Sequence, residues 1–352
     1  IIEYHTETAY DANDEEVNRL NFLYRNIEDY GVGHLCSVDW GSIDGILHVW
    51  SEFLPSVETP DVEPIPRNKH AEVRDENGLI IPAPFIEATD FLQLKKLSVF
   101  SDATDEEIRQ GLIDFVNCYN LWIDGLETDN EIGVVNIERC RCDYNRMVNN
   151  INDFLTDPDK MSCFRLMNAS MFMQLWHNSP ENKQFLRESR IRTDFEFYRD
   201  MADDTSIFNG IHAAWRPFQL AFILLNLDGI FRRENDNNWN ERNNLVDLVW
   251  FPTGGGKTEA YLGIIALTII NRRRTFGDIG YGTASIMRYT LRLLTTQQFQ
   301  RALRLIMALE EMRSWNIFNL GNEEISIGLY VGKSSLPNTD QELREEVNDW
   351  GR

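Results

Sequence analysis

Long apolar runs are missing from this sequence. The best candidate, residues 220–227, is interrupted by Asn226, whereas a membrane helix needs about 20 apolar residues. An initiator methionine and a secretion signal are also lacking, so we expect a piece of a longer protein without an export signal. The cysteines are few, odd in number and scattered, which favours reduced thiols in the cytoplasm rather than a disulfide framework. They are Cys36, Cys118, Cys140, Cys142 and Cys163.

Two further kinds of site lack their usual signatures. The pair Cys140 and Cys142 is spaced too closely for a zinc knuckle, and six histidines are dispersed along the chain, so we expect no zinc site. The Gly-x-Ser-x-Gly elbow of serine hydrolases is also absent.

The sequence does contain an uneven distribution of charge along the chain. Its 352 residues are 43% apolar and 26% charged, as in a globular protein of about two domains. Residues 1–210 hold 40 acids and 18 bases, a net charge of −22, whereas residues 211–352 hold 16 of each, a net charge of zero. Because phosphate contacts need Lys and Arg, nucleic acid is disfavoured as a ligand of the first part only.

The pattern of elements predicts two domains. Residues 1–205 are expected to form an acidic accessory domain of mixed α/β structure, with a helix entry at residues 102–107 and helices over 105–120 and 161–176. In residues 206–352, apolar β-rich runs alternate with helical segments, which predicts an α/β fold with a parallel sheet. The expected strands are 245–251, 284–289 and 324–331; the expected helices are 258–270 and 291–312.

A phosphate-binding loop is predicted between the first of these strands and its helix. Glycines let backbone N–H groups curl around phosphates, and the following helix adds its dipole. A lysine then supplies positive charge and a threonine hydroxyl can hold Mg²⁺. The alternative is a glycine turn that happens to precede Lys-Thr. The loop predicts ATP and Mg²⁺ as cofactors, and its residues are Thr253, Gly254, Gly255, Gly256, Lys257 and Thr258.

A helix start upstream offers a candidate reader of the nucleotide base. Trp215-Arg216-Pro217-Phe218-Gln219 places Pro217 where a missing N–H is harmless. The amide of Gln219 can donate and accept at once, which suits the edge of adenine. The alternative is an amphipathic helix start in which Gln219 only caps its neighbours.

In sequence order these motifs resemble the series of superfamily 2 helicases. Arg216 and Gln219 are similar to the Q motif, the phosphate loop to motif I, and Thr290–Gln297 to motif Ia; Tyr330–Lys333 lies where a motif Ib-like turn is expected. The resemblance implies that residues 206–352 form the first RecA-like lobe. It also implies DNA contacts from Thr290, Arg292, Gln297, Gly332 and Lys333, with Arg301 and Arg304 near them.

A closer resemblance covers about residues 160–335. Trp250–Gly263, Met287–Leu294 and Gln298–Ala302 resemble the helicase subunit of the DISARM anti-phage systems, the DrmA type. The resemblance implies an ATP-dependent DNA helicase or translocase that acts with a DrmB-type partner. Its substrate would be single-stranded phage DNA or a duplex end.

The Asp-Glu-x-His/Asp motif that activates water in these enzymes is absent after residue 335, as is a second RecA-like lobe. We therefore expect this stretch to bind ATP without hydrolysing it efficiently. Two alternatives stay open: a P-loop ATPase that remodels RNA or protein, and a scaffold whose assembly is gated by nucleotide.

Overall fold

Contacts divide the chain into two compact units. The computed structural model describes residues 14–23, 25, 36–52, 73–74, 80–81, 92–189, 192–201, 213–233, 244–249, 256–289, 292–330, 339, 341 and 344. The first unit comprises Ile1–Glu87, Asp114–Asn149 and Leu248–Gly255. The second comprises Ala88–Ile113, Asn150–Asp247 and Gly256–Arg352. The second unit thus takes in residues on both sides of the predicted boundary at 205/206, which stays a prediction.

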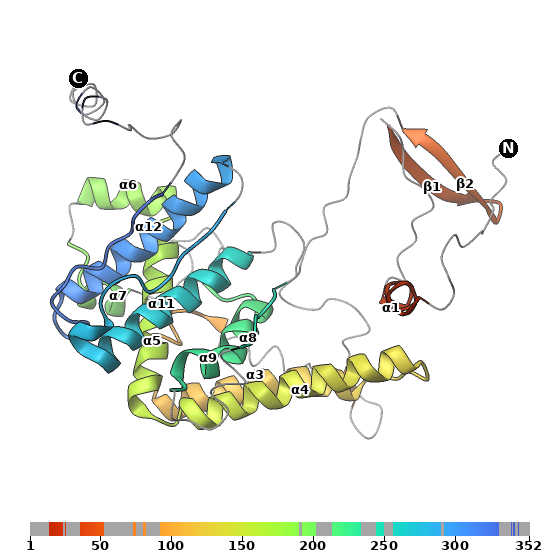
Figure 1. Ribbon diagram of the computed structural model, residues 1–352, viewed down its shortest axis with the longest axis horizontal. Helices are drawn as coiled ribbons and strands as arrows, with labels where there is room; N and C mark the ends of the chain where they lie inside the picture. The colour runs from red at the N-terminus through yellow and green to blue at the C-terminus, as the bar shows by residue number, and fades with distance from the viewer. Residues whose placement is uncertain are drawn as a thin grey trace. The chain divides into compact units, whose positions relative to one another are not determined.

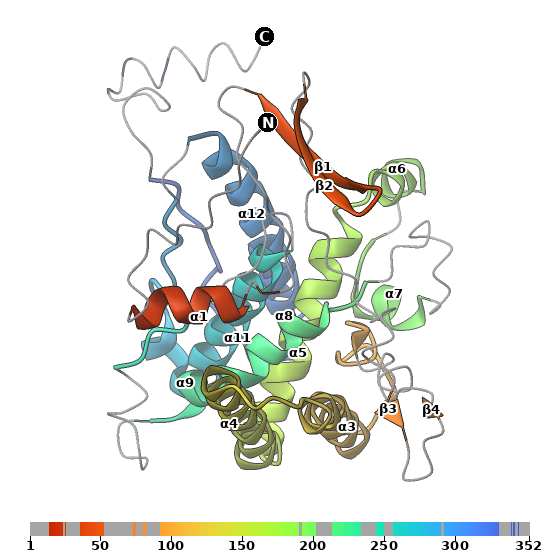
Figure 2. The same cartoon turned by 90° about the vertical axis from the view of Figure 1, so that its right-hand side faces the viewer.

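The first unit contains the strands that pair in the described part of the chain. Strand β1 (Ser37–Ile43) pairs antiparallel with β2 (Ile46–Glu52), so that Ile43 faces Ile46 (Figure 2). Asp44 and Gly45 join them with φ angles of 51° and 77°, the left-handed conformation that Asp-Gly hairpin turns require. Two shorter strands, β3 (Val73–Arg74) and β4 (Ile80–Ile81), also pair antiparallel, and α1 spans Glu15–Leu23.

Two long helices follow. Helix α3 (Asp105–Asp124) begins at a capping box, which confirms the predicted entry. The Glu107 carboxylate accepts from the Thr104 backbone N–H at 2.7 Å, and the Thr104 hydroxyl accepts from the Glu107 N–H at 3.2 Å. Helix α4 spans Glu131–Phe154.

Helix α5 (Pro158–Trp176) is the centre of the second unit, and most of its side chains are buried. Helices α11 (Lys257–Phe276) and α12 (Arg292–Ser314) both pack against it (Figure 1). These helices confirm the predictions for 161–176, 258–270 and 291–312. The remaining helices are α6 (Pro180–Ser189), α7 (Phe195–Asp200), α8 (Pro217–Leu225), α9 (Leu227–Phe231) and the 3₁₀ turn η4 (Gly277–Gly280). None of the helices that the structure describes is both long and apolar enough to cross a membrane.

The three predicted strands of the second domain form no ladder within the residues described. Residues 245–249, 284–289 and 324–330 carry no strand pairing. Val246, Ile286 and Tyr330 are 94%, 84% and 101% exposed, whereas a strand inside a covered parallel sheet is buried on both faces. Parts of these segments and their neighbours lie outside the described residues, so the RecA-like sheet stays a prediction.

One buried hydrogen bond fixes α8 onto α5. The indole Nε1–H of Trp215, just before α8, donates to Oδ1 of Asn168 on α5 at 2.7 Å. Both residues are almost fully buried. The Trp215 backbone N–H also donates to the Leu92 carbonyl at 2.7 Å. The start of α8 is therefore held from two sides.

Trp215→Phe is expected to lower the free energy of unfolding by about 1–3 kcal/mol, because it leaves the buried Asn168 oxygen without its donor. Urea unfolding would measure the loss. The matched control is Trp122→Phe, at a site 44% exposed, which should change stability by less than about 0.5 kcal/mol. Equal effects of the two substitutions would show that the Trp215 bond contributes nothing specific.

Candidate functional site

The phosphate-loop residues that the structure describes lie at the start of α11. Gly256 is the N-cap, in the left-handed conformation with φ 85° and ψ 25°. Lys257 and Thr258 form the first turn of the helix, and both are half-buried. The remaining predicted loop residues, Thr253, Gly254 and Gly255, lie outside the described residues. The described part places a cation and a hydroxyl at the positive end of a helix 20 residues long.

Gln219 binds the phosphate loop directly. Its Nε2 donates to the Gly256 carbonyl at 2.7 Å, and its Oε1 accepts from the Arg216 backbone N–H at 2.8 Å. The side chain is only 4% exposed. Pro217 occupies the first turn of α8, as predicted. The structure thus brings together three predicted nucleotide-binding residues, Arg216, Gln219 and Gly256. The bond from the Arg216 N–H is the capping contact that the sequence offered as the alternative role of Gln219, whereas the bond to Gly256 was not predicted. A role of Gln219 in reading the base stays a prediction.

The close approach of Gln219 explains why a glycine stands at position 256. A Cβ built there would lie 2.7 Å from Gln219 Nε2 and 3.5 Å from Glu259 Oε2. The positive φ adds to this requirement, because L-residues rarely adopt it. A backbone turn that admits no side chain, followed by a helix N-terminus, has the shape and polarity of a phosphate cradle. The chemistry of Gly256, Lys257 and Thr258 therefore fits a phosphate group with Mg²⁺, and ATP as the ligand stays a prediction.

An ion pair joins the first turn of α11 to α12. The Glu259 carboxylate Oε1 accepts from Nη2 of Arg301. The Glu259 side chain is 14% exposed and that of Arg301 is 36% exposed. Arg301 was expected among the cations near the DNA; the structure pairs it with an acid of the phosphate-loop helix. The sequence contains one signal for this ion pair, the acid Glu259 directly after Lys257 and Thr258, and it was not used in the predictions.

A partly exposed phenol lies near this ion pair. Burial raises the pKa of Tyr289, the nearby Tyr261 phenol raises it further, and Arg301 lowers it. Tyr261 also packs edge-on against Phe222 of α8, with ring centroids 6.2 Å apart. Since Tyr289 stays neutral at ordinary pH, it adds no negative charge beside Arg301.

The predicted DNA-binding residues are only partly described. Thr290, Gly332 and Lys333 lie outside the described residues. Arg292 begins α12, and Gln297 is exposed on the same helix. Their roles in DNA binding stay predictions.

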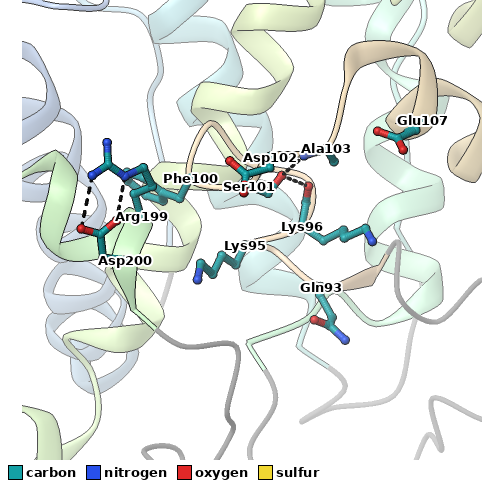
Figure 3. Close-up of a pocket in the computed structure, with 10 residues that line it drawn as sticks. All are labelled: Gln93, Lys95, Lys96, Phe100, Ser101, Asp102, Ala103, Glu107, Arg199 and Asp200. Atoms are coloured by element: carbon teal, nitrogen blue, oxygen red, sulfur yellow. Dashed lines mark hydrogen bonds and ion pairs between the residues drawn. The ribbon is translucent and has the colours of Figure 1, made fainter.

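A separate cavity of about 580 Å³ opens beside the start of α3 (Figure 3). The Arg199–Asp200 pair lies on one side and Glu107 on the opposite side. Arg199 and Asp200 bind each other, Glu107 caps α3, and Lys95 Nζ donates to the Met201 carbonyl. Its charged walls are therefore largely engaged within the protein. The lining residues are Gln93, Lys95, Lys96, Phe100, Ser101, Asp102, Ala103, Glu107, Arg199 and Asp200.

The chain is similar to one curated protein of bacterial defence. It is 32% identical, over an alignment of 354 positions, to the DISARM protein DrmA of Bacillus paralicheniformis. The alignment covers 95% of this chain but only 28% of that relative, so the chain spans little more than a quarter of the relative's length. No protein-family model matches the chain.

Proposed function

We propose that the chain is part of a DrmA-type protein of a DISARM anti-phage system, acting in the cytoplasm as an ATP-dependent DNA helicase or translocase. The observation that carries the proposal is the Gln219–Gly256 contact, which holds a left-handed glycine directly before Lys257 and Thr258. The similarity to the DISARM protein DrmA supports the same conclusion.

The described residues have separate tasks in nucleotide binding. Gln219 fixes the Gly256 carbonyl, so that the backbone enters α11 in one orientation. Lys257 supplies positive charge to the outer phosphates, and the dipole of α11 adds to it. The Thr258 hydroxyl holds Mg²⁺, which supplies charge neutralisation at the phosphates when bound.

The DNA path is proposed to follow the start of α12. The second part of the chain carries no net charge, whereas residues 1–210 carry −22, so a phosphate backbone is repelled less by the second part. Arg292 and Gln297 lie on this helix. The acidic first part is then available to a protein, for which we propose a DrmB-type partner.

ATP hydrolysis by the intact natural protein, measured with and without single-stranded DNA, tests the proposal. We expect hydrolysis to rise when DNA is added. Stimulation by RNA alone would instead indicate an ATPase that remodels RNA. ATP binding without turnover, with an assembly state that depends on ATP, would indicate a nucleotide-gated scaffold.

A further inference from the structure

The ion pair between Glu259 and Arg301 joins α11, to which the proposed function assigns the nucleotide, to α12, to which it assigns DNA. Glu259 lies in the first turn of α11, one turn after Gly256. Arg301 lies on α12, the helix that begins with Arg292. The partners are 42 positions apart in sequence, so the pair forms only when α11 and α12 pack side by side.

Glu259 also touches the phosphate loop. Its backbone N–H donates to the Gly256 carbonyl at 3.2 Å, the same oxygen that accepts from Gln219. Its second carboxylate oxygen lies close enough to Gly256 to contact a Cβ built there, at 3.5 Å. A displacement of Arg301 therefore acts on a side chain that lies against the phosphate loop.

Charge gives this contact a consequence for the nucleotide. A carboxylate at a helix N-terminus competes with bound phosphate for the positive end of the dipole and repels it. Arg301 neutralises that carboxylate. The strength of the Arg301 contact thus determines how much negative charge lies next to the nucleotide phosphates. The Arg301 side chain is 36% exposed, so an anion bound along α12 can interact with it.

We propose that the Glu259–Arg301 pair is the positioning link that couples nucleic-acid binding along α12 to nucleotide binding at Gly256–Thr258. The proposal rests on the proposed function, since it presupposes that both ligands bind. Coupling between two sites is reciprocal: the factor by which nucleotide changes the affinity for DNA equals the factor by which DNA changes the affinity for nucleotide.

The test measures this factor by binding alone, so that it does not depend on hydrolysis. The dissociation constant of a labelled single-stranded thymidine oligonucleotide is measured on the intact protein, with and without a non-hydrolysable ATP analogue. The ratio of the two constants is the coupling factor. The variants are Glu259→Gln, Arg301→Gln and the charge exchange Glu259→Arg with Arg301→Glu.

We expect the unmutated protein to show a coupling factor of about 10, within the usual range of about 5 to 150. Glu259→Gln should reduce it below about 2, and the affinity for nucleotide alone should rise, because the variant lacks a carboxylate that repels phosphate. The charge exchange should keep an ion pair but show no coupling, because a carboxylate at position 301 repels DNA phosphates instead of binding them. The matched control is Glu106→Gln, which breaks an ordinary exposed pair with Arg109 on α3 and should leave the factor unchanged.

The outcomes separate the two proposals. If the unmutated protein binds neither ligand, the proposed function fails and this inference fails with it. If both ligands bind and either no coupling exists or Glu259→Gln retains it, only this inference is overturned.

Discussion

Lys257→Ala is expected to lower the turnover of the intact protein by about 100-fold or more, the usual cost of removing one group that stabilises developing charge, and also to weaken nucleotide binding. The side chain stands in the first turn of α11, where the helix dipole already favours phosphate. Alanine keeps the helix intact but removes the compact charge. Folding should survive, because Lys257 is only half-buried and alanine is the best helix former.

Titration with a fluorescent ATP analogue measures the affinity, and thermal unfolding shows whether the variant is folded. The matched control is Lys160→Ala, which removes a lysine from the first turn of another helix of the same unit, α5. Lys160 pairs with Asp157 at 3.5 Å, so its loss should alter stability slightly and nucleotide affinity not at all. A Lys257→Ala protein that binds ATP as tightly as the unmutated one would remove the basis for the phosphate site.

Gly256→Ala is expected to disrupt the same site through the backbone. The new Cβ would meet Gln219 Nε2 at 2.7 Å. Gln219 is buried and already bonded at both ends of its amide, so moving it breaks a buried hydrogen bond. The substitution also carries the strain of a positive φ, about 1–3 kcal/mol.

A second glycine of the chain separates these two costs. Gly282 has a φ of 88°, almost equal to that of Gly256, and a Cβ there would meet nothing within 4 Å. Gly282→Ala therefore carries the strain without the collision. Urea unfolding should show Gly256→Ala to be less stable than Gly282→Ala by about 1–3 kcal/mol, the cost of a broken buried hydrogen bond. Only Gly256→Ala should weaken nucleotide binding. Equal losses of stability in both variants would show that Gln219 moves away from the new Cβ without a measurable change in the free energy of unfolding.

Local patterns in the sequence predict α3, α5, α11, α12 and the start of α8, whereas α1, α4, α6, α7 and α9 were not predicted. The cap at Thr104 and Glu107 identifies the start of α3, and Pro217 identifies the start of α8. Both signals act within one helical turn, so nearby residues suffice to read them. Helix α4 escapes prediction because its sequence is rich in asparagine and arginine and its apolar residues Val134 and Val135 are exposed.

Contacts between distant residues could not be predicted in the same way. Gln219 and Gly256 are 37 positions apart, and Glu259 and Arg301 are 42 apart. No periodicity relates such residues, because their meeting depends on how whole helices pack. Strand pairing has the same dependence: the β-rich runs at 284–289 and 324–330 predict strands, but a strand needs a neighbour, and the described residues supply none.

Helix α11 is held by hydrogen bonds at both ends and is closely packed at Gly263. Gly256 is held by Gln219 at one end; at the other, the Arg273 guanidinium donates to the carbonyls of Leu320, Glu323 and Glu324. Between them, Gly263 packs so tightly that a Cβ would lie 2.9 Å from both Trp215 and Ile223. A helix of 20 residues is about 30 Å long and does not stretch. Helix α11 therefore keeps the Gly256 turn and the 320–324 segment at a fixed separation along its axis.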